Sequence, residues 1–188
     1  MSDLLQVEKR GHIAIITMNN PPANIWTIDS LYLLKDIVEA LNADKGNYAL
    51  VLTGQGEKFF CAGADLKMFA DGDKDNARKA AQAFGDGFQA LTDYEGVSIA
   101  AINGFAMGGG LEAAMACDIR IAESKAKMAL PEAKVGLLPC GLGTQHLPAL
   151  VGEGWAKRMI LCNEQLNADK ALEIGLVQEV VETGKALE

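Results

Sequence analysis

Two almost entirely apolar runs of strand length limit the fold more than any other feature of the sequence. Residues 48–53 are Tyr-Ala-Leu-Val-Leu-Thr, and residues 97–102 are Val-Ser-Ile-Ala-Ala-Ile. A strand without regular polar alternation is typical of a parallel sheet that is covered on both faces. Between these runs, over residues 73–94, apolar residues recur at the spacing of one helix face. The sequence therefore predicts an α/β fold in which strands and helices alternate.

The other expected elements are shorter and fill a single domain over residues 1–188. A hairpin is expected around Arg10 and Gly11, and a helix capped by Thr27 or Asp29 should bury Leu31, Leu34, Val38 and Leu41. Further strands are expected at 59–61, 118–122, 127–129 and 176–181, and further helices after residue 110, at 152–162 and at 167–174. Residues 182–188 resemble the opening of another helix, and we expect a C-terminal part to be missing.

Composition and charge narrow the functional classes. Hydrophobic residues make up 49% of the 188 residues and charged residues 22%, which is ordinary for a globular protein. A formal net charge of −8 disfavours nucleic-acid binding. The four cysteines form no Cys-x-x-Cys pair, so free thiols in the cytoplasm are expected rather than disulfides or a metal site. No signal peptide or membrane span is predicted.

Several well-known catalytic motifs are absent from the sequence. There is no Gly-x-Ser-x-Gly turn, no phosphate-binding Gly-x-x-x-x-Gly-Lys loop and no dinucleotide-binding Gly-x-Gly-x-x-Gly turn. Two histidines are too few for a histidine-rich metal centre. We therefore expect a site without a metal or cofactor, built from carboxylates and backbone groups.

Two loops before expected helices can supply backbone donors. In residues 59–67 a short strand turns through small residues, and Asp65 is placed to cap a helix; taken alone, this segment is better explained as an ordinary strand-to-helix turn. Gly108, Gly109 and Gly110 open the second helix, where three glycines favour close approach of a ligand, although tight packing remains the alternative. If the N–H groups of Ala64 and Gly109 converge, they form an oxyanion hole.

Two glutamates accompany these loops. Glu112 lies in the first turn after the glycines among apolar neighbours, and Glu132 follows Pro131 twenty residues later. A solvated helix-start residue is the alternative at either position. Paired carboxyls suit the addition of water to a double bond, because one group deprotonates water and the other handles the proton at the adjacent carbon.

These segments resemble the crotonase (enoyl-CoA hydratase/isomerase) superfamily. The blocks are Phe60-Cys61-Ala62-Gly63-Ala64-Asp65-Leu66, the stretch from Asn103 to Glu112, Pro131-Glu132 followed by Gly136 and Pro139, and the stretch from Asn167 to Val177. The resemblance covers the whole chain. It implies a spiral of ββα units, a coenzyme A thioester substrate, and a homotrimer or dimer of trimers. It also implies that the C-terminal helices of the family are absent or truncated here.

Carried over by position, the resemblance implies that Glu132 exchanges the proton at the carbon next to the carbonyl and that Glu112 helps to activate water. It also implies that Ala64 and Gly109 form the oxyanion hole. It also implies a substrate-binding set, with Lys67 near a coenzyme phosphate: Ala23, Asn24, Ala62, Asp65, Leu66, Lys67, Met107, Gly108, Pro131 and Cys140.

Departures from the family pattern concern the pocket. Cys140 stands where hydratases commonly have glycine, close to the expected water, and Asn24-Ile25-Trp26 replaces a smaller aliphatic run. The favoured activity is hydration of 2-enoyl-CoA to 3-hydroxyacyl-CoA. The alternatives are a double-bond isomerase that depends mainly on Glu132, and a non-catalytic thioester-binding scaffold.

Overall fold

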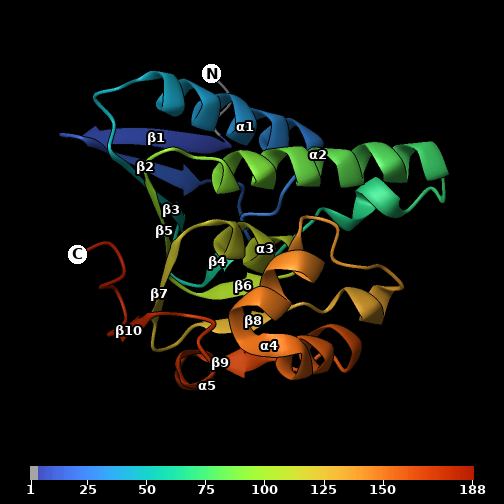
Figure 1. The fold of residues 1–188 in the computed structure, drawn as a ribbon. Helices are drawn as coiled ribbons and strands as arrows, with labels where there is room; N and C mark the ends of the chain where they lie inside the picture. Colours follow the sequence, from blue (N-terminus) through green and yellow to red (C-terminus); the bar gives the residue numbers. More distant parts are fainter. Residues whose placement is uncertain (1–3) are drawn as a thin grey trace.

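The computed structural model describes residues 4–188, whose strands form two sheets (Figure 1). The larger sheet has the order β1-β2-β3-β5-β7-β10, and only the β1–β2 pair is antiparallel. Its strands are β1 (Leu5–Arg10), β2 (Ile13–Met18), β3 (Ala49–Gly54), β5 (Val97–Ile102), β7 (Ile119–Glu123) and β10 (Glu179–Val181). The predicted hairpin is therefore confirmed, and the two apolar runs lie side by side as β3 and β5.

The chain repeats one unit three times: a strand of the larger sheet, a short strand of the smaller sheet, and a helical segment. The smaller sheet has the order β4-β6-β8-β9 and comprises β4 (Phe59–Cys61), β6 (Phe105–Met107), β8 (Lys127–Ala129) and β9 (Leu166–Asn167). The helical segments are η1 (Leu66–Phe69) with α2 (Lys74–Thr92), α3 (Gly109–Ala116), and η2 (Glu132–Val135) with α4 (Gly143–Leu161). This succession is the predicted spiral of ββα units.

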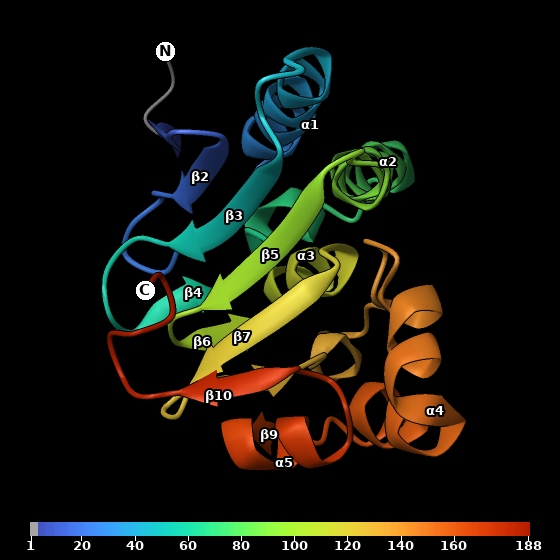
Figure 2. The same cartoon turned by 60° about the vertical axis from the view of Figure 1, so that its left-hand side comes forward.

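Helices cover one side of the larger sheet, where α1 (Ile28–Ala43), α2, α3 and α4 lie together (Figure 2). The α1 helix begins at Thr27, whose hydroxyl accepts the Ser30 N–H in a capping box. The apolar face predicted for this helix is fully buried. Each helix packs on the next, α1 on α2, α2 on α3 and α3 on α4. Short α5 (Ala168–Glu173) follows β9.

Several boundaries differ from the sequence expectations, each for a local reason. The helix expected over 152–162 is the second half of α4, which begins nine residues earlier and bends at Gly152. The last strand is shorter than 176–181, because the N–H groups of Leu176 and Val177 donate to Ala171 and close the end of α5. Residues 182–188 form turns instead of a helix, and Gly184 has a φ of +87° there. The strands β6 and β9 were not predicted.

Two further expectations concern cysteines and the membrane. All four cysteines are free. Within residues 4–188, no helix is both long and apolar enough to cross a bilayer.

Candidate active site

Glu112 is held at the first turn of α3 by a loop from the next unit of the fold. Its side chain is almost completely buried, and its Oε1 accepts N–H groups from Gly141 at 2.9 Å and Gly143 at 2.8 Å. The intervening Leu142 has a φ of +71°, which turns both amides toward the same oxygen. Because Oε1 already accepts two donors, Oε2 is the oxygen that remains available for chemistry.

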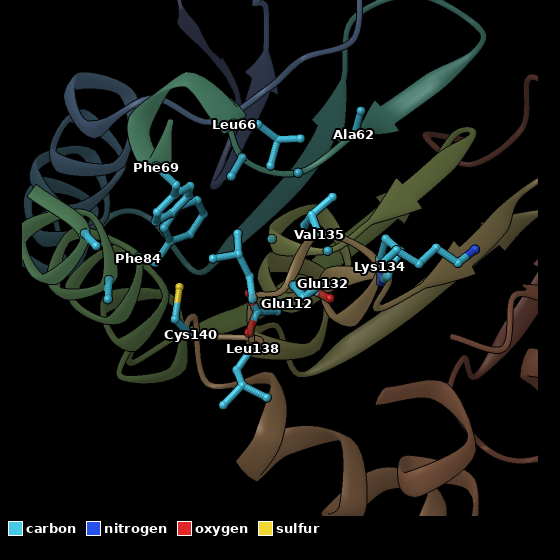
Figure 3. A pocket seen from close by; sticks show the side chains of 18 residues that line it. Ala62, Leu66, Phe69, Phe84, Glu112, Glu132, Lys134, Val135, Leu138 and Cys140 are labelled. Carbon is cyan, nitrogen blue, oxygen red and sulfur yellow. The ribbon is translucent and has the colours of Figure 1, made fainter. Parts of the chain in front are cut away.

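Glu132 begins η2 and lines the same pocket as Glu112, and Figure 3 shows the two side chains together. Its Oε2 is buried and has no hydrogen-bond partner within residues 4–188. A Cβ on Gly108 would lie 2.9 Å from Oε1, and Gly108 has a φ of +51°. Glycine at 108 is therefore required both by its backbone conformation and by the space that Glu132 occupies.

Burial keeps both carboxyl groups from ionising at their usual pH. It raises the pKa of Glu112 to about 8, with a further contribution from the charge of Glu132 and an opposing one from the Gly143 and Gly141 amides. Burial also raises the pKa of Glu132 to about 7. Because the two groups interact, they titrate as a pair, and the pair retains a proton near neutral pH.

The two predicted amide donors come from segments that are in direct contact. A Cβ on Gly110 would lie 2.2 Å from the carbonyl oxygen of Cys61, and a Cβ on Gly63 would lie 3.5 Å from the backbone nitrogen of Gly109. The N–H groups of Ala64 and Gly109 donate to no acceptor within residues 4–188. The pocket that both residues line therefore contains two unsatisfied backbone donors.

The pocket has a volume of about 440 Å³ and mostly apolar walls. One wall comes from η1 and α2, and the opposite wall from the segment after Glu132; together they contribute Leu66, Phe69, Ala77, Ala81, Phe84, Val135, Leu137 and Leu138. Half-buried Cys140 lies among these residues (Figure 3). Burial, together with the charges of both glutamates, raises the pKa of Cys140 to about 12, so its sulfur remains a neutral thiol.

The structure places most of the predicted site residues in this pocket. They are Ala62, Ala64, Leu66, Gly108, Gly109, Glu112, Pro131, Glu132 and Cys140. The other predicted residues, Ala23, Asn24, Asp65, Lys67 and Met107, do not line it. Asn24 is buried and donates to the backbone oxygens of Gln55, Phe59 and Phe60, and Asp65 caps η1 by accepting the Lys67 N–H.

Other pocket residues were missed by sequence reasoning. The lining cation is Lys134 instead of Lys67, and its ammonium group points away from the glutamates in Figure 3. Ala77, Ala81 and Phe84 recur at spacings of four and three residues, which is a signal for one helix face, but the sequence does not say what that face contacts. No group of three or more His, Cys, Asp or Glu side chains within residues 4–188 is arranged to hold a metal ion.

Paired carboxyls beside paired amide donors form a site for proton transfer next to a carbonyl group. Residues 8–188 match the model of the enoyl-CoA hydratase/isomerase family. A short-chain-enoyl-CoA hydratase of Clostridium acetobutylicum and a crotonyl-CoA hydratase of Syntrophomonas wolfei are each 42% identical over 182 residues, covering 96% of this chain and 70% of the relative. The chain belongs to the enoyl-CoA hydratase/isomerase family.

Solved structures agree with this assignment. DspI of Pseudomonas aeruginosa superposes with a TM-score of 0.97 at 67% identity, over 98% of this chain and 76% of that one. An enoyl-CoA hydratase from Bacillus anthracis superposes with a TM-score of 0.94 at 36% identity, over 98% of this chain and 72% of that one. The resemblance found in the sequence is confirmed for both the family and the fold.

Proposed function

We propose that the protein is a hydro-lyase that adds water to 2-enoyl-CoA thioesters and forms 3-hydroxyacyl-CoA. The observation that carries the proposal is that buried Glu112 and partly buried Glu132 line one pocket with the unsatisfied amides of Ala64 and Gly109. The names of the relatives support the same reaction. In this proposal the thioester oxygen accepts both N–H groups, and the acyl chain lies along the apolar walls.

The addition proceeds by movement of two protons. Glu112 Oε2 removes a proton from water as the water oxygen bonds to C3, and the electron pair of the C2=C3 bond shifts toward the thioester oxygen. The Ala64 and Gly109 amides stabilise the negative charge on that oxygen; one such donor is typically worth about 10²–10³ in rate. Glu132 then delivers its proton to C2, and the carbonyl group is restored.

The raised pKa values fit the proton balance of this step. A single proton on the carboxyl pair provides one ionised group as base and one protonated group as acid. The reactive state is the one in which Glu132 carries the shared proton. The two N–H groups on Glu112 Oε1 stabilise the ionised Glu112 of that state, against the burial that raises the pKa of Glu112 to about 8. The chemistry then needs no cofactor other than the coenzyme A of the substrate.

Matched glutamine variants test the proposal. Glu112→Gln and Glu132→Gln should each lower kcat by about 10²–10⁴. The rate is measured from the decrease in 2-enoyl thioester absorbance. Glu123→Gln is the control, because Glu123 is equally buried, pairs with Lys125 at 3.2 Å and does not line the pocket. If only Glu132→Gln lost activity, double-bond isomerisation would replace hydration. If both variants retained activity, the assigned roles of the glutamates would be wrong, and a wild-type protein that binds the thioester without converting it would be a binding scaffold.

We also propose that residues 1–188 form one domain, that the protein acts in the cytoplasm and, from the family resemblance, that it is a homotrimer or a dimer of trimers. The single-domain proposal is supported by one hydrophobic cluster that includes residues from Leu5 to Val177. Light scattering on the purified protein measures the oligomer directly, and a monomer at micromolar concentration would contradict the trimer.

A further inference from the structure

We propose that Trp26 is a positioning residue that holds both amides of the oxyanion hole in register with each other. The inference rests on the proposed function of Ala64 and Gly109. Trp26 lies in the loop between β2 and α1, one residue before the N-cap of α1, and only 1% of its surface is exposed. It does not line the pocket, so it acts through the two donor segments and not on the substrate.

The backbone of Trp26 holds the first donor segment. The Trp26 N–H donates to the carbonyl oxygen of Gly63 at 2.8 Å, and the Asp65 N–H donates to the carbonyl oxygen of Trp26 at 2.9 Å. These bonds form a parallel bridge between Trp26 and Ala64. In a parallel bridge of this kind, the N–H of the residue between the two bonded partners points away from the opposing strand. The Ala64 N–H therefore points away from Trp26, which leaves it available to a ligand.

The side chain of Trp26 holds the second donor segment. Its indole Nε1–H donates to the carbonyl oxygen of Gly109 at 3.2 Å, across 83 residues of sequence. Gly109 is the first residue of α3, and the preceding Gly108 gives that helix no side-chain cap. The indole bond thus fixes the orientation of the residue whose own N–H is the second donor.

Neighbouring aromatic rings keep the indole in place. The Trp26 ring meets Phe88 edge-on at a centroid distance of 5.7 Å, and Phe88 meets Phe84 in the same way at 5.6 Å. Phe84 in turn fills the space beside Gly109, where a Cβ would lie 2.7 Å from the Phe84 ring. One residue is therefore bonded to both donor segments and is itself held by the ring cluster that packs against the second segment.

The test separates the indole N–H from the bulk of the ring. Trp26→Phe removes the donor and leaves the backbone bonds and a buried ring, so kcat should fall by about tenfold, a fraction of the loss expected for a deleted donor. KM should change by less than about threefold, because no substrate contact is removed. Trp155→Phe is the matched control, because Trp155 is the other tryptophan, lies on α4 and does not line the pocket.

A spectroscopic readout distinguishes positioning from packing. The probe is butyryl-CoA carrying a ¹³C carbonyl, whose infrared stretch moves to lower frequency when the oxygen accepts hydrogen bonds. Wild-type protein and Trp155→Phe should show the full shift, and Trp26→Phe a smaller one at saturating probe. A wild-type shift and wild-type kcat in Trp26→Phe would overturn the inference, and so would a lower kcat with an unchanged shift. If wild-type protein neither shifts the carbonyl stretch nor hydrates enoyl thioesters, the proposed function fails instead.

Discussion

Replacing Gly110 with alanine tests whether the contact between the two donor segments sets the rate. An added Cβ would lie 2.2 Å from the carbonyl oxygen of Cys61, and ordinary contact begins at 3.4 Å. The added Cβ and the Cys61 carbonyl oxygen are both rigidly attached to the backbone, so neither can rotate away. The α3 helix must therefore move by about 1 Å relative to the Cys61 segment. A misplacement of about 1 Å can cost about 10²-fold in rate, and overpacking of this kind costs about 1–3 kcal/mol of stability.

The assay is hydration of a 2-enoyl thioester, measured together with urea unfolding of the same variant. We expect kcat to fall by about 10²-fold in Gly110→Ala while enough stability remains for folding at 25 °C. Gly154→Ala is the control, because Gly154 lies in α4 with nothing within 4 Å of an added Cβ. This control should gain about 1 kcal/mol from helix propensity and retain its activity. A folded Gly110→Ala variant with kcat within threefold of wild type would refute the reasoning.

Two further predictions concern Glu112. Because the folded-state pKa values of Glu112 and Glu132 lie above the ordinary 4.5, the folded chain binds more protons than the unfolded chain, and stability falls as pH rises through about 7 to 8. Urea midpoints from about pH 5 to about pH 9 should therefore fall less steeply in Glu112→Gln than in wild type, and equal slopes would contradict the assigned pKa values. Leu142→Gly should retain kcat, because glycine adopts the left-handed conformation freely, whereas Leu142→Ile should lower kcat about tenfold and raise the pKa of Glu112 as the two amides turn away. If Leu142→Ile retained kcat and Leu142→Gly lost it, the leucine side chain would matter instead of the backbone conformation.

Local patterns predicted much of the fold. The capped helix after Thr27 and the parallel strands β3 and β5 depend on short-range spacing and capping, which a single sequence displays directly. The errors lie where distant contacts set the boundaries. β6 was missed because it lies inside the stretch that leads into the glycine-rich helix start, and it is a strand because it pairs with both β4 and β8. The last strand is short because the N–H groups of Leu176 and Val177 donate to Ala171 at the end of α5 instead of to a neighbouring strand.

The sequence by itself determined most of the strands and helices and their order, the glycine-rich helix start and the two candidate glutamates, because periodicity, capping and motif spacing are local properties. Only the tertiary structure decided that Glu112 is buried in the pocket that Glu132 also lines, that the Gly141 and Gly143 amides occupy one oxygen of Glu112, and that Lys134 lines this pocket while Lys67 does not. The same holds for the bond from Trp26 to Gly109, which joins residues 83 positions apart. Burial, pKa and long-range hydrogen bonds depend on which segments meet in space, and the spacing of residues along one chain does not encode that directly.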